Sequence, residues 1–312
     1  MMMNGRLRKV KSSAELAFLR AVRLYTFNTP IPKGKYRAFM VAMRLCHDVP
    51  DGLTVNTRDG RLLSVDLSTG MQSSVFFLGE YEKAITRILE TIIRRNGFER
   101  FVDAGANFGW YTSLFHKYAK SVGEVHSFEP VPPIFENLER NYELMCRPSN
   151  VHINRNALGD ETKTITVNLF EGLSTGHASI SDQGRGDAIG FDCQMITMDD
   201  YLTEKNVKEI DLVKVDIEGA ELLFLKGAQS LFRQKTPPVF LMEMALNQTK
   251  NFGYIPNDLI DFIRERGEYR FYKIDERRTK LAEIDGFPSD DIGANVICIP
   301  ESIRENSIRG LT

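Results

Sequence analysis

The spacing of apolar residues changes once along the chain, near residue 80. Before that point, helical spacing predicts a helix that runs to Tyr25 and, after a Pro-Gly break, a second helix around Phe39. Residues 53–67 predict a hairpin that turns at Asp59-Gly60, because this pair supplies the positive φ angles of a tight turn. These elements are too small to bury a core alone, so they are predicted to form a cap on a following body.

Beyond residue 80 the pattern alternates between helices and short strands. One apolar helix face begins at Ala84, and Gly97 is suited to its C-terminal cap. Five short apolar strands follow, at residues 101–102, 125–128, 151–153, 212–215 and 239–242. Segments long enough for a helix separate most of them, which is typical of a parallel sheet with helices on both faces. The last two strands, 270–274 and 295–299, are predicted to form an antiparallel hairpin at one edge.

The composition is that of an ordinary soluble globular protein. The 312 residues are 42% hydrophobic and 26% charged, which excludes a disordered chain, a collagen and a disulfide miniprotein. The formal net charge is -2, yet residues 1–47 hold ten Lys and Arg against one acid, whereas the remainder holds 30 bases against 41 acids. This basic arm is predicted to be a solvated helical cap, with peripheral contact to an anionic membrane surface or to an anionic acceptor as open alternatives.

Export signals and metal or disulfide patterns are absent from the sequence. No apolar run approaches the ~18 residues that span a bilayer, and the N-terminus lacks the apolar core of a signal peptide, so a cytoplasmic location is expected. The cysteines form no C-x-x-C pair, and neither a disulfide framework nor a zinc knuckle is predicted. They are Cys46, Cys146, Cys193 and Cys298.

Polar residues stand at the carboxyl ends of the five predicted parallel strands. They are Asp103, Glu129, Asn156, Asp216 and Glu243. In open α/β sheets ligands bind outside these ends, so the five side chains are expected to converge on one crevice.

The first strand leads into a glycine-rich turn, Asp103-Ala104-Gly105-Ala106-Asn107-Phe108-Gly109. A dinucleotide fingerprint would need glycines at the positions of Asn107 and Trp110, so a pyrophosphate-binding turn is disfavoured. Glu129 lies 20 residues after Gly109, the distance at which an acid binds ribose hydroxyls. A nucleoside without phosphates and with a cationic amino-acid end fits both observations, and S-adenosylmethionine is such a ligand.

Several ordered motifs surround these residues. They are residues 102–109, 128–130, 156–160, 197–202 and 214–226, with a weaker match at 79–82. Together they resemble the FkbM family of S-adenosylmethionine-dependent methyltransferases. The resemblance implies an α/β, Rossmann-like class I methyltransferase fold, with a seven-stranded, mostly parallel sheet and an antiparallel last strand. Residues 1–80 would form the helical and hairpin cap, 81–303 the methyltransferase domain and 304–312 a C-terminal tail.

The resemblance also implies a reaction and roles for individual residues. The reaction is transfer of a methyl group to a hydroxyl of a sugar, glycan, polyketide or other small molecule. S-adenosylmethionine would be bound by Glu82, Asp103, Gly105, Asn107, Gly109, Thr112, Glu129, Pro130, Asn156, Ala157 and Asp216.

An alcohol is a poor nucleophile until its proton is leaving, so a general base is expected near the methyl group. Asp216 is predicted to be this base, and Glu218 and Glu243 are neighbours that raise its pKa or orient the acceptor. His177, in a loop at 174–190 that is predicted to be mobile, is another candidate base.

Alternatives stay open for the acidic residues and for the function. In one alternative, Glu218 has a purely structural role and stabilises the start of the helix near Gly219. In another, the three carboxylates hold a divalent cation, although no metal site is predicted. A nicotinamide-dependent oxidoreductase should show the missing glycines. A nucleic-acid methyltransferase fits the basic arm, but the fourth strand lacks the proline-aromatic tetrad of N-methylating enzymes, so no nucleic-acid partner is expected. A non-catalytic binding module also shares this fold.

Overall fold

The computed structural model describes residues 13–29, 34–45, 52–119, 123–170, 178–179, 188–288 and 292–312. The chain divides into two compact units, Met1–Tyr81 and Glu82–Thr312, and each is described by itself.

The first unit combines three helices with a hairpin. Its elements are α1 (Ser13–Arg23), which continues as the π-helix η1 (Leu24–Asn28), α2 (Lys35–Leu45), β1 (Leu53–Asn56), β2 (Leu62–Val65) and α3 (Gly70–Leu78). Strands β1 and β2 pair antiparallel, and Gly60 has a φ of 86°, as the hairpin prediction requires. The unit buries apolar side chains of its own, since the rings of Phe39 and Phe77 are 5.4 Å apart. Helix α3 was not predicted, because it buries Gln72 and Ser73 beside its apolar residues and so shows no apolar stripe.

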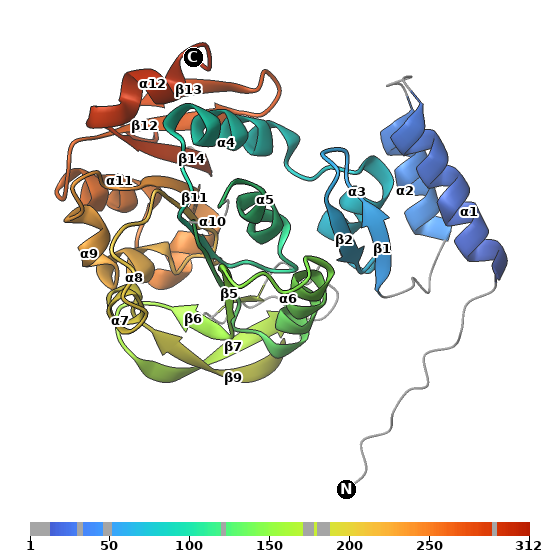
Figure 1. Ribbon diagram of the computed structural model, residues 1–312, viewed down its shortest axis with the longest axis horizontal. Helices are drawn as coiled ribbons and strands as arrows, with labels where there is room; N and C mark the ends of the chain where they lie inside the picture. The colour runs from blue at the N-terminus through green and yellow to red at the C-terminus, as the bar shows by residue number, and fades with distance from the viewer. Residues whose placement is uncertain are drawn as a thin grey trace, which may run out of the picture. The chain divides into compact units, whose positions relative to one another are not determined.

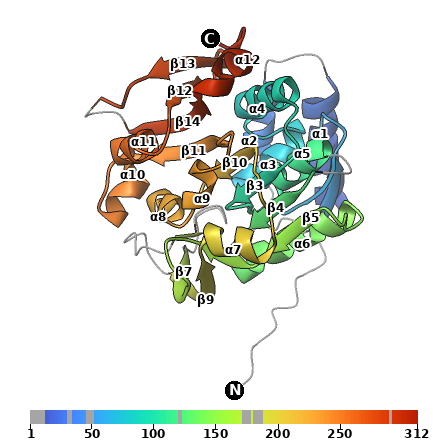
Figure 2. The same cartoon turned by 60° about the vertical axis from the view of Figure 1, so that its left-hand side comes forward.

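The second unit is built on an eight-stranded sheet. Its strands are β3 (Phe101–Ala104), β4 (Val125–Phe128), β5 (Val151–Asn154), β10 (Leu212–Val215), β11 (Val239–Ala245), β12 (Tyr269–Asp275), β13 (Lys280–Ile284) and β14 (Gly293–Pro300). They lie in the order β13-β12-β14-β11-β10-β3-β4-β5, which Figure 2 shows from the upper left to the lower right. Strands β5, β4, β3, β10 and β11 are parallel, and β14 is antiparallel to its neighbours.

The predicted Rossmann-like α/β class with an antiparallel last strand is confirmed, with two differences at one edge. Strand β13 adds an eighth strand beyond β12. Strand β14 inserts between β11 and β12, so the predicted pairing of the last two strands exists but does not form the edge itself. The insertion leaves β11 paired on both sides and buries its apolar residues.

Helices cover both faces of this sheet (Figure 1). Helices α4 (Lys83–Asn96), α5 (Trp110–Ala119) and α6 (Pro132–Leu144) lie on one face, and α8 (Glu221–Lys226), α9 (Gln229–Phe232) and α11 (Pro256–Arg264) lie on the other. The main buried cluster joins the sheet to α8, α9 and α11 through side chains such as Phe224, Phe240 and Ile260. Two further helices, α7 (Met198–Glu204) and α10 (Leu246–Thr249), follow strands, and the 3-10 turn η2 (Lys250–Phe252) follows α10.

The C-terminal residues are folded rather than a free tail. The 3-10 turn η3 (Glu301–Ile303) leads into α12 (Arg304–Ile308), which packs on α4. The Asn96 side-chain amide donates to Ser307 Oγ at 3.0 Å, and the Asn306 amide donates to the Arg95 carbonyl oxygen at 2.8 Å. These contacts make α12 part of the second unit.

A second, smaller sheet was not predicted. It contains β6 (Asn156–Leu158), β7 (Lys163–Phe170), β8 (Ala178–Ser179) and β9 (Ala188–Ile196) in the order β6-β9-β7-β8. Strand β9 begins inside the segment 174–190 that was predicted to be a mobile loop, and most of that segment lies outside the described residues.

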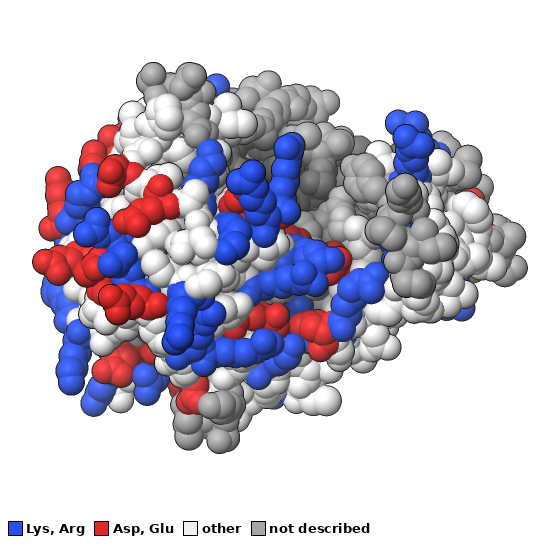
Figure 3. All heavy atoms as spheres, turned by 90° about the horizontal axis from the view of Figure 1, so that it is seen from above, with Lys and Arg blue, Asp and Glu red and all other residues white. Residues whose placement is uncertain are grey.

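Charged side chains of both signs alternate over the side where α4, α12 and β13 lie (Figure 3). Ion pairs here include Arg94 with Glu90 at 3.5 Å and Arg270 with Glu301 at 2.9 Å. The excess of acids in this unit is therefore not gathered on this side. Within the described part of the chain, none of the helices has the length and apolar character needed to cross a membrane.

Candidate functional site

Asp103 is a completely buried carboxyl group within β3. Its Oδ2 accepts a hydrogen bond from Thr112 Oγ1 at 2.7 Å, and the same hydroxyl lies 2.8 Å from Ser127 Oγ. Its Oδ1 has no hydrogen-bond partner among the described residues. Burial raises the pKa of Asp103, and the nearby Lys214 ammonium partly opposes this rise. Thr112, predicted to bind the cofactor, is fully buried, and its hydroxyl orients Asp103.

The glycine-rich turn after β3 has left-handed backbone at alternate residues. The φ angles of Gly105, Asn107 and Gly109 are 78°, 50° and 90°. The N–H groups of Gly105 and Ala106 both donate to the Phe128 carbonyl oxygen, which ties the turn to β4. A Cβ atom on Gly105 would lie 1.9 Å from the backbone oxygen of Asp216. The glycine therefore lets the turn lie directly against the segment that carries Asp216.

Replacing Gly105 with Ala should destabilise the second unit more than the same change at Gly97. Both residues have positive φ, but no atom lies within 4 Å of a Cβ on Gly97. We expect a loss of about 1 kcal/mol for Gly97→Ala from its backbone alone, and roughly 2–4 kcal/mol for Gly105→Ala once the backbone clash is added. Urea unfolding followed by the fluorescence of Trp110, the single tryptophan, measures both. Equal losses would mean that the Asp216 segment moves away freely.

Glu129 joins this turn to the start of α6. Its Oε2 accepts from the Asn107 N–H at 3.1 Å, and its Oε1 accepts from the Val131 N–H at 3.1 Å. Burial raises the pKa of Glu129 to about 7, although both hydrogen bonds act to lower it. Each carboxylate oxygen has two lone pairs, so one acceptor position on each oxygen is left for a ligand hydroxyl.

Lys214 is a buried cation that was not predicted to be a site residue. Its Nζ donates to the Gly105 carbonyl oxygen at 2.9 Å and lies 3.3 Å from Asp216 Oδ2 and 3.9 Å from Asp103 Oδ1. Burial acts to lower the pKa of Lys214, but the charges of Asp216 and Asp103 outweigh it and raise this pKa. The sequence did carry a signal, because a lysine stands inside the otherwise apolar strand β10.

An aromatic residue and a second carboxylate lie next to Lys214. The Tyr111 ring centroid is 5.4 Å from Lys214 Nζ, and the Tyr111 hydroxyl donates to Glu82 Oε2 at 2.5 Å. Glu82 also contributes to the raised pKa of Lys214. The predicted cofactor residue Glu82 thus belongs to the same charged cluster as Asp103 and Asp216.

Three carboxylates and one amide lie beyond the end of β10. Asp216 follows the strand and exposes 36% of its side chain, whereas Glu218, with a φ of 55°, is buried. Gln248 Nε2 donates to Glu218 Oε2 at 2.8 Å and to Glu243 Oε2 at 3.1 Å. Burial is the main cause that raises the pKa of Glu243 to about 9, and the negative charge of Asp216 is the second. Gln248 was not predicted.

Glu243 does not end its strand as predicted. Strand β11 continues to Ala245, and Glu243 pairs with Asn295 of β14. Pairing with β14 extends β11 beyond Met242, where the predicted apolar run ended. The Glu243 carboxyl group therefore projects from within the sheet.

Glu221 holds the loop between Asp216 and α8. Glu221 Oε1 accepts from the N–H groups of Ile217 and Gly219 at 3.2 and 3.1 Å. The Tyr254 hydroxyl donates to the Gly219 carbonyl oxygen at 2.7 Å. Glu221, which was not predicted, therefore makes backbone contacts just before α8, the place where one alternative for Glu218 also put a stabilising acid.

Three of the remaining predicted residues contact the second, smaller sheet. Asn156 and Ala157 belong to β6 of the second sheet, and the Asn156 amide donates to the Gln194 carbonyl oxygen at 3.4 Å. The Pro130 carbonyl oxygen accepts from Cys193 Sγ at 3.1 Å. His177 lies outside the described residues. Within the described ranges, no group of three or more His, Cys, Asp or Glu side chains is arranged to hold a metal ion.

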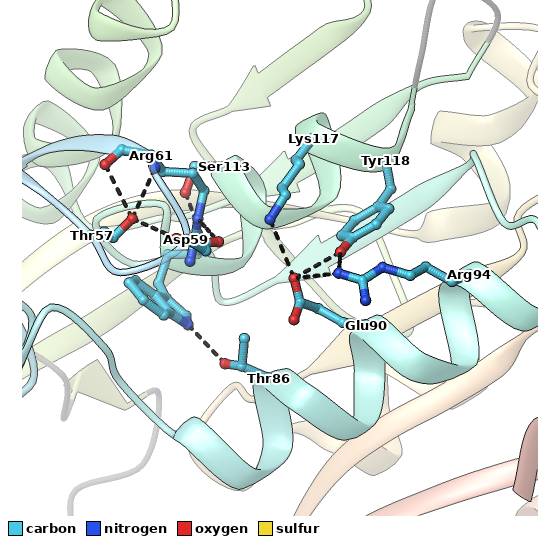
Figure 4. Close-up of polar contacts among 10 residues, drawn as sticks. Thr57, Asp59, Arg61, Thr86, Glu90, Arg94, Ser113, Lys117 and Tyr118 are labelled. Carbon is cyan, nitrogen blue, oxygen red and sulfur yellow. Dashed lines mark hydrogen bonds and ion pairs between the residues drawn. The ribbon is translucent and has the colours of Figure 1, made fainter.

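A polar network fixes α5, which starts at the glycine-rich turn, against α4 (Figure 4). Glu90 Oε1 accepts from the Tyr118 hydroxyl at 2.7 Å and lies 3.4 Å from Lys117 Nζ. The Trp110 indole N–H donates to Thr86 Oγ1 at 3.3 Å. These contacts connect α4 to α5 and so hold the helix that follows the glycine-rich turn in place.

One family model matches the chain, and two similar curated proteins are methyltransferases. The family described as the methyltransferase FkbM domain matches residues 103–271, a range that contains every site residue above except Glu82. The chain is 29% identical over 153 residues to methyltransferase sdnD of Sordaria araneosa, which covers 40% of this chain and 59% of that protein. It is 32% identical over 145 residues to methyltransferase 1 of Beauveria bassiana, which covers 40% of this chain and 57% of that protein.

The chain spans slightly less than three fifths of the length of these two relatives. A crystal structure of methyltransferase FkbM from Methylobacillus flagellatus aligns with a TM-score of 0.40 and 17% identity, over 65% of this chain and 43% of that one.

Proposed function

Because the chain belongs to the methyltransferase FkbM domain family, as its motifs predicted, we propose that it transfers a methyl group from S-adenosylmethionine to a hydroxyl of a small molecule or glycan. The family match covers more than half of the chain. The observation that carries the proposal is the row of carboxylates along the strand ends, with Asp103 and Glu129 beside the glycine-rich turn and Asp216 next to them.

The residues around the turn fit S-adenosylmethionine. Asp103 Oδ1 is a buried acceptor without a hydrogen-bond partner among the described residues, and an ammonium group would satisfy it. Glu129 keeps lone pairs for the two hydroxyls of a ribose. The bound cofactor supplies a methyl group on a positively charged sulfur, and no pyrophosphate has to be accommodated by the turn.

Asp216 is suited to act as the general base. A hydroxyl becomes a good nucleophile only as its proton leaves, whereas a neutral amine already offers its lone pair. A carboxylate that can accept this proton therefore supports an oxygen acceptor. Asp216 is a carboxyl group that solvent and an acceptor can reach, because 36% of its side chain is exposed, whereas Asp103 and Glu218 are buried. Lys214 Nζ, 3.3 Å from Asp216 Oδ2, pairs with the carboxyl group and fixes its orientation.

The experiment that tests this function uses S-adenosylmethionine with a 13C-labelled methyl group. The full chain is incubated with the labelled cofactor and extracts of the source organism, and the product is identified by mass spectrometry and carbon NMR. We expect one labelled methyl group on an oxygen atom. Failure of the chain to bind the cofactor in calorimetry, or a label on nitrogen, would overturn the proposal or its oxygen acceptor.

Replacing Glu129 with Ala should weaken the binding of S-adenosylmethionine. Hydrogen bonds to a charged group contribute roughly 1.5–3 kcal/mol, which corresponds to about a tenfold to hundredfold loss of affinity. Calorimetry at pH 8 measures the loss, and Glu90→Ala is the matched control because Glu90 lies in the α4–α5 network. Equal affinities of the two variants would remove Glu129 from the cofactor site.

The affinity for the cofactor should also depend on pH through Glu129. Ribose hydroxyls donate to the ionised carboxylate, and its pKa is about 7 in the absence of a ligand. Affinity should therefore be constant above this pKa and fall below it, approaching ~tenfold per pH unit for one proton. Calorimetry between pH 5.5 and 8.5 tests this, and a profile shared by the wild type and Glu129→Ala would contradict it.

A further inference from the structure

Gln248 lies at the carboxyl edge of the large sheet, beside the proposed base. The short helix α10, which carries Gln248, begins directly after β11. The pairing of Val215 with Met242 places the residues that follow them, Asp216 and Glu243, side by side on neighbouring strands. Gln248 Nε2 donates to Glu243 Oε2 at 3.1 Å. Gln248 therefore lies next to the carboxyl groups at the strand ends, where ligands of open α/β sheets bind.

The side-chain amide of Gln248 has a fixed orientation. Its Nε2 donates to Glu218 Oε2 at 2.8 Å as well as to Glu243 Oε2. The opposite orientation would place the amide oxygen against two carboxyl oxygens, so hydrogen-bond chemistry selects the orientation with the nitrogen between them. Close packing holds α10 here, because a Cβ on Gly219 would lie 2.8 Å from the Gln248 backbone oxygen. The amide oxygen is thereby turned away from both carboxyl groups.

This amide oxygen is a buried acceptor that lacks a donor. Gln248 is 5% exposed, and its Oε1 has no hydrogen-bond partner among the described residues. Buried polar atoms are nearly always paired, so the missing donor is supplied by water or by a ligand. An amide oxygen only accepts hydrogen bonds, so the ligand group that it binds is a hydroxyl, an amine or an ammonium group and not an anion.

The neighbouring groups are suited to the same kind of ligand. Asp216 exposes 36% of its side chain to an incoming molecule. Lys214, a cation in this cluster, donates to the Gly105 carbonyl oxygen at 2.9 Å and pairs with Asp216 at 3.3 Å. An acceptor with two donors, one for Asp216 and one for Gln248 Oε1, matches these groups. An acceptor with an anionic group at this position would instead meet the carboxyl groups, which disfavours it.

We propose that the Gln248 amide oxygen binds a second hydrogen-bond donor of the acceptor, next to the hydroxyl that Asp216 deprotonates. Gln248 is thus a specificity-determining residue, and the acceptor is a diol or an amino alcohol rather than a molecule with a single hydroxyl. Glu218 and Glu243 act through Gln248, because they hold its amide in place. This inference rests on the proposed function and on the role of Asp216 in it.

The acceptor side of this contact can be tested with the wild type alone. The acceptor that gains the 13C label in the experiment above is compared with deoxy analogues, in which hydrogen replaces one neighbouring hydroxyl or amino group at a time. We expect kcat/KM to fall about ten- to a hundredfold for one analogue, as when a lost hydrogen bond leaves a buried acceptor unpaired. An acceptor without a second donor, or equal kcat/KM for every analogue, would overturn the proposal.

The variant Gln248→Met assigns this loss to the amide, since it keeps the length of the side chain and removes its oxygen and nitrogen. Its kcat/KM with the identified acceptor should fall by a similar factor, and removing the second donor from the acceptor should then cost no further activity. A purely structural role would lower both activities and keep the wild-type ratio between acceptor and analogue, which would contradict the proposal. Gln234→Met is the control and should keep that ratio, because Gln234 accepts from the Ile210 N–H before β10.

Failure of the proposed function is distinguishable from failure of this inference. A chain that does not bind S-adenosylmethionine in calorimetry, or a label on nitrogen, contradicts the function itself. A label on oxygen together with the wild-type ratio in Gln248→Met contradicts only the role of Gln248, and water rather than the acceptor then satisfies its amide oxygen.

Discussion

Asp216→Asn should lower kcat by about 10²–10⁴-fold, the usual contribution of a general base, while S-adenosylmethionine still binds. The amide has nearly the same shape but cannot accept the proton of an acceptor hydroxyl. The glycine-rich turn should keep its position, because Lys214 still donates to the Gly105 carbonyl oxygen and Gly105 still packs on the backbone of residue 216. Single-turnover transfer of a labelled methyl group, together with calorimetry of cofactor binding, separates the two effects.

Asp192→Asn is the matched control for this experiment. Asp192 lies in β9 of the second, smaller sheet, where its Oδ1 accepts from Thr166 Oγ1 at 2.9 Å. Full turnover in Asp216→Asn would exclude Asp216 as the base. A loss of cofactor binding equal to the loss of turnover would instead assign Asp216 to the cofactor.

The sheet could be predicted because each of its parallel strands is a short, buried apolar run. The run Leu212-Val213-Lys214-Val215 is buried along its whole length, and such runs separated by helices have few possible arrangements. The position of β14 could not be predicted in the same way. Its place between β11 and β12 depends on pairings between residues far apart in the chain, such as Met242 with Val296.

Local sequence marked most of the residues that we propose for the cofactor and the acceptor, but it did not mark Gln248. Asp103 and Glu129 stand at fixed distances from a glycine-rich turn, so local sequence marks them. No sequence pattern around Gln248 indicates a site residue. One of its partners, Glu218, is 30 residues away in the chain, and the two meet only in the folded protein. Lys214 could be noticed because its neighbours in the strand are apolar, but its contact with Asp103 depends on how β3 and β10 pair.

Lys214→Met should lower the free energy of unfolding of the second unit by about 3–5 kcal/mol, the cost of removing one partner from a buried ion pair. Asp103 is completely buried, and Lys214 is the cation that acts on it. Urea unfolding followed by Trp110 fluorescence measures the loss. Lys117→Met is the control, because Lys117 is 36% exposed beside Glu90 and such surface pairs contribute only about 0–1 kcal/mol.

The pH dependence of this loss identifies its cause. Without Lys214 the pKa of Asp103 in the folded unit should rise further above its value in the unfolded chain. A carboxyl group with a raised folded-state pKa binds its proton more tightly when folded, so its destabilising effect is relieved as pH falls below that pKa. The Lys214→Met unit should therefore lose less stability, relative to the wild type, at pH 5 than at pH 8. A loss that does not change with pH would mean that lost packing of the lysine side chain, and not the unpaired charge of Asp103, destabilises the variant.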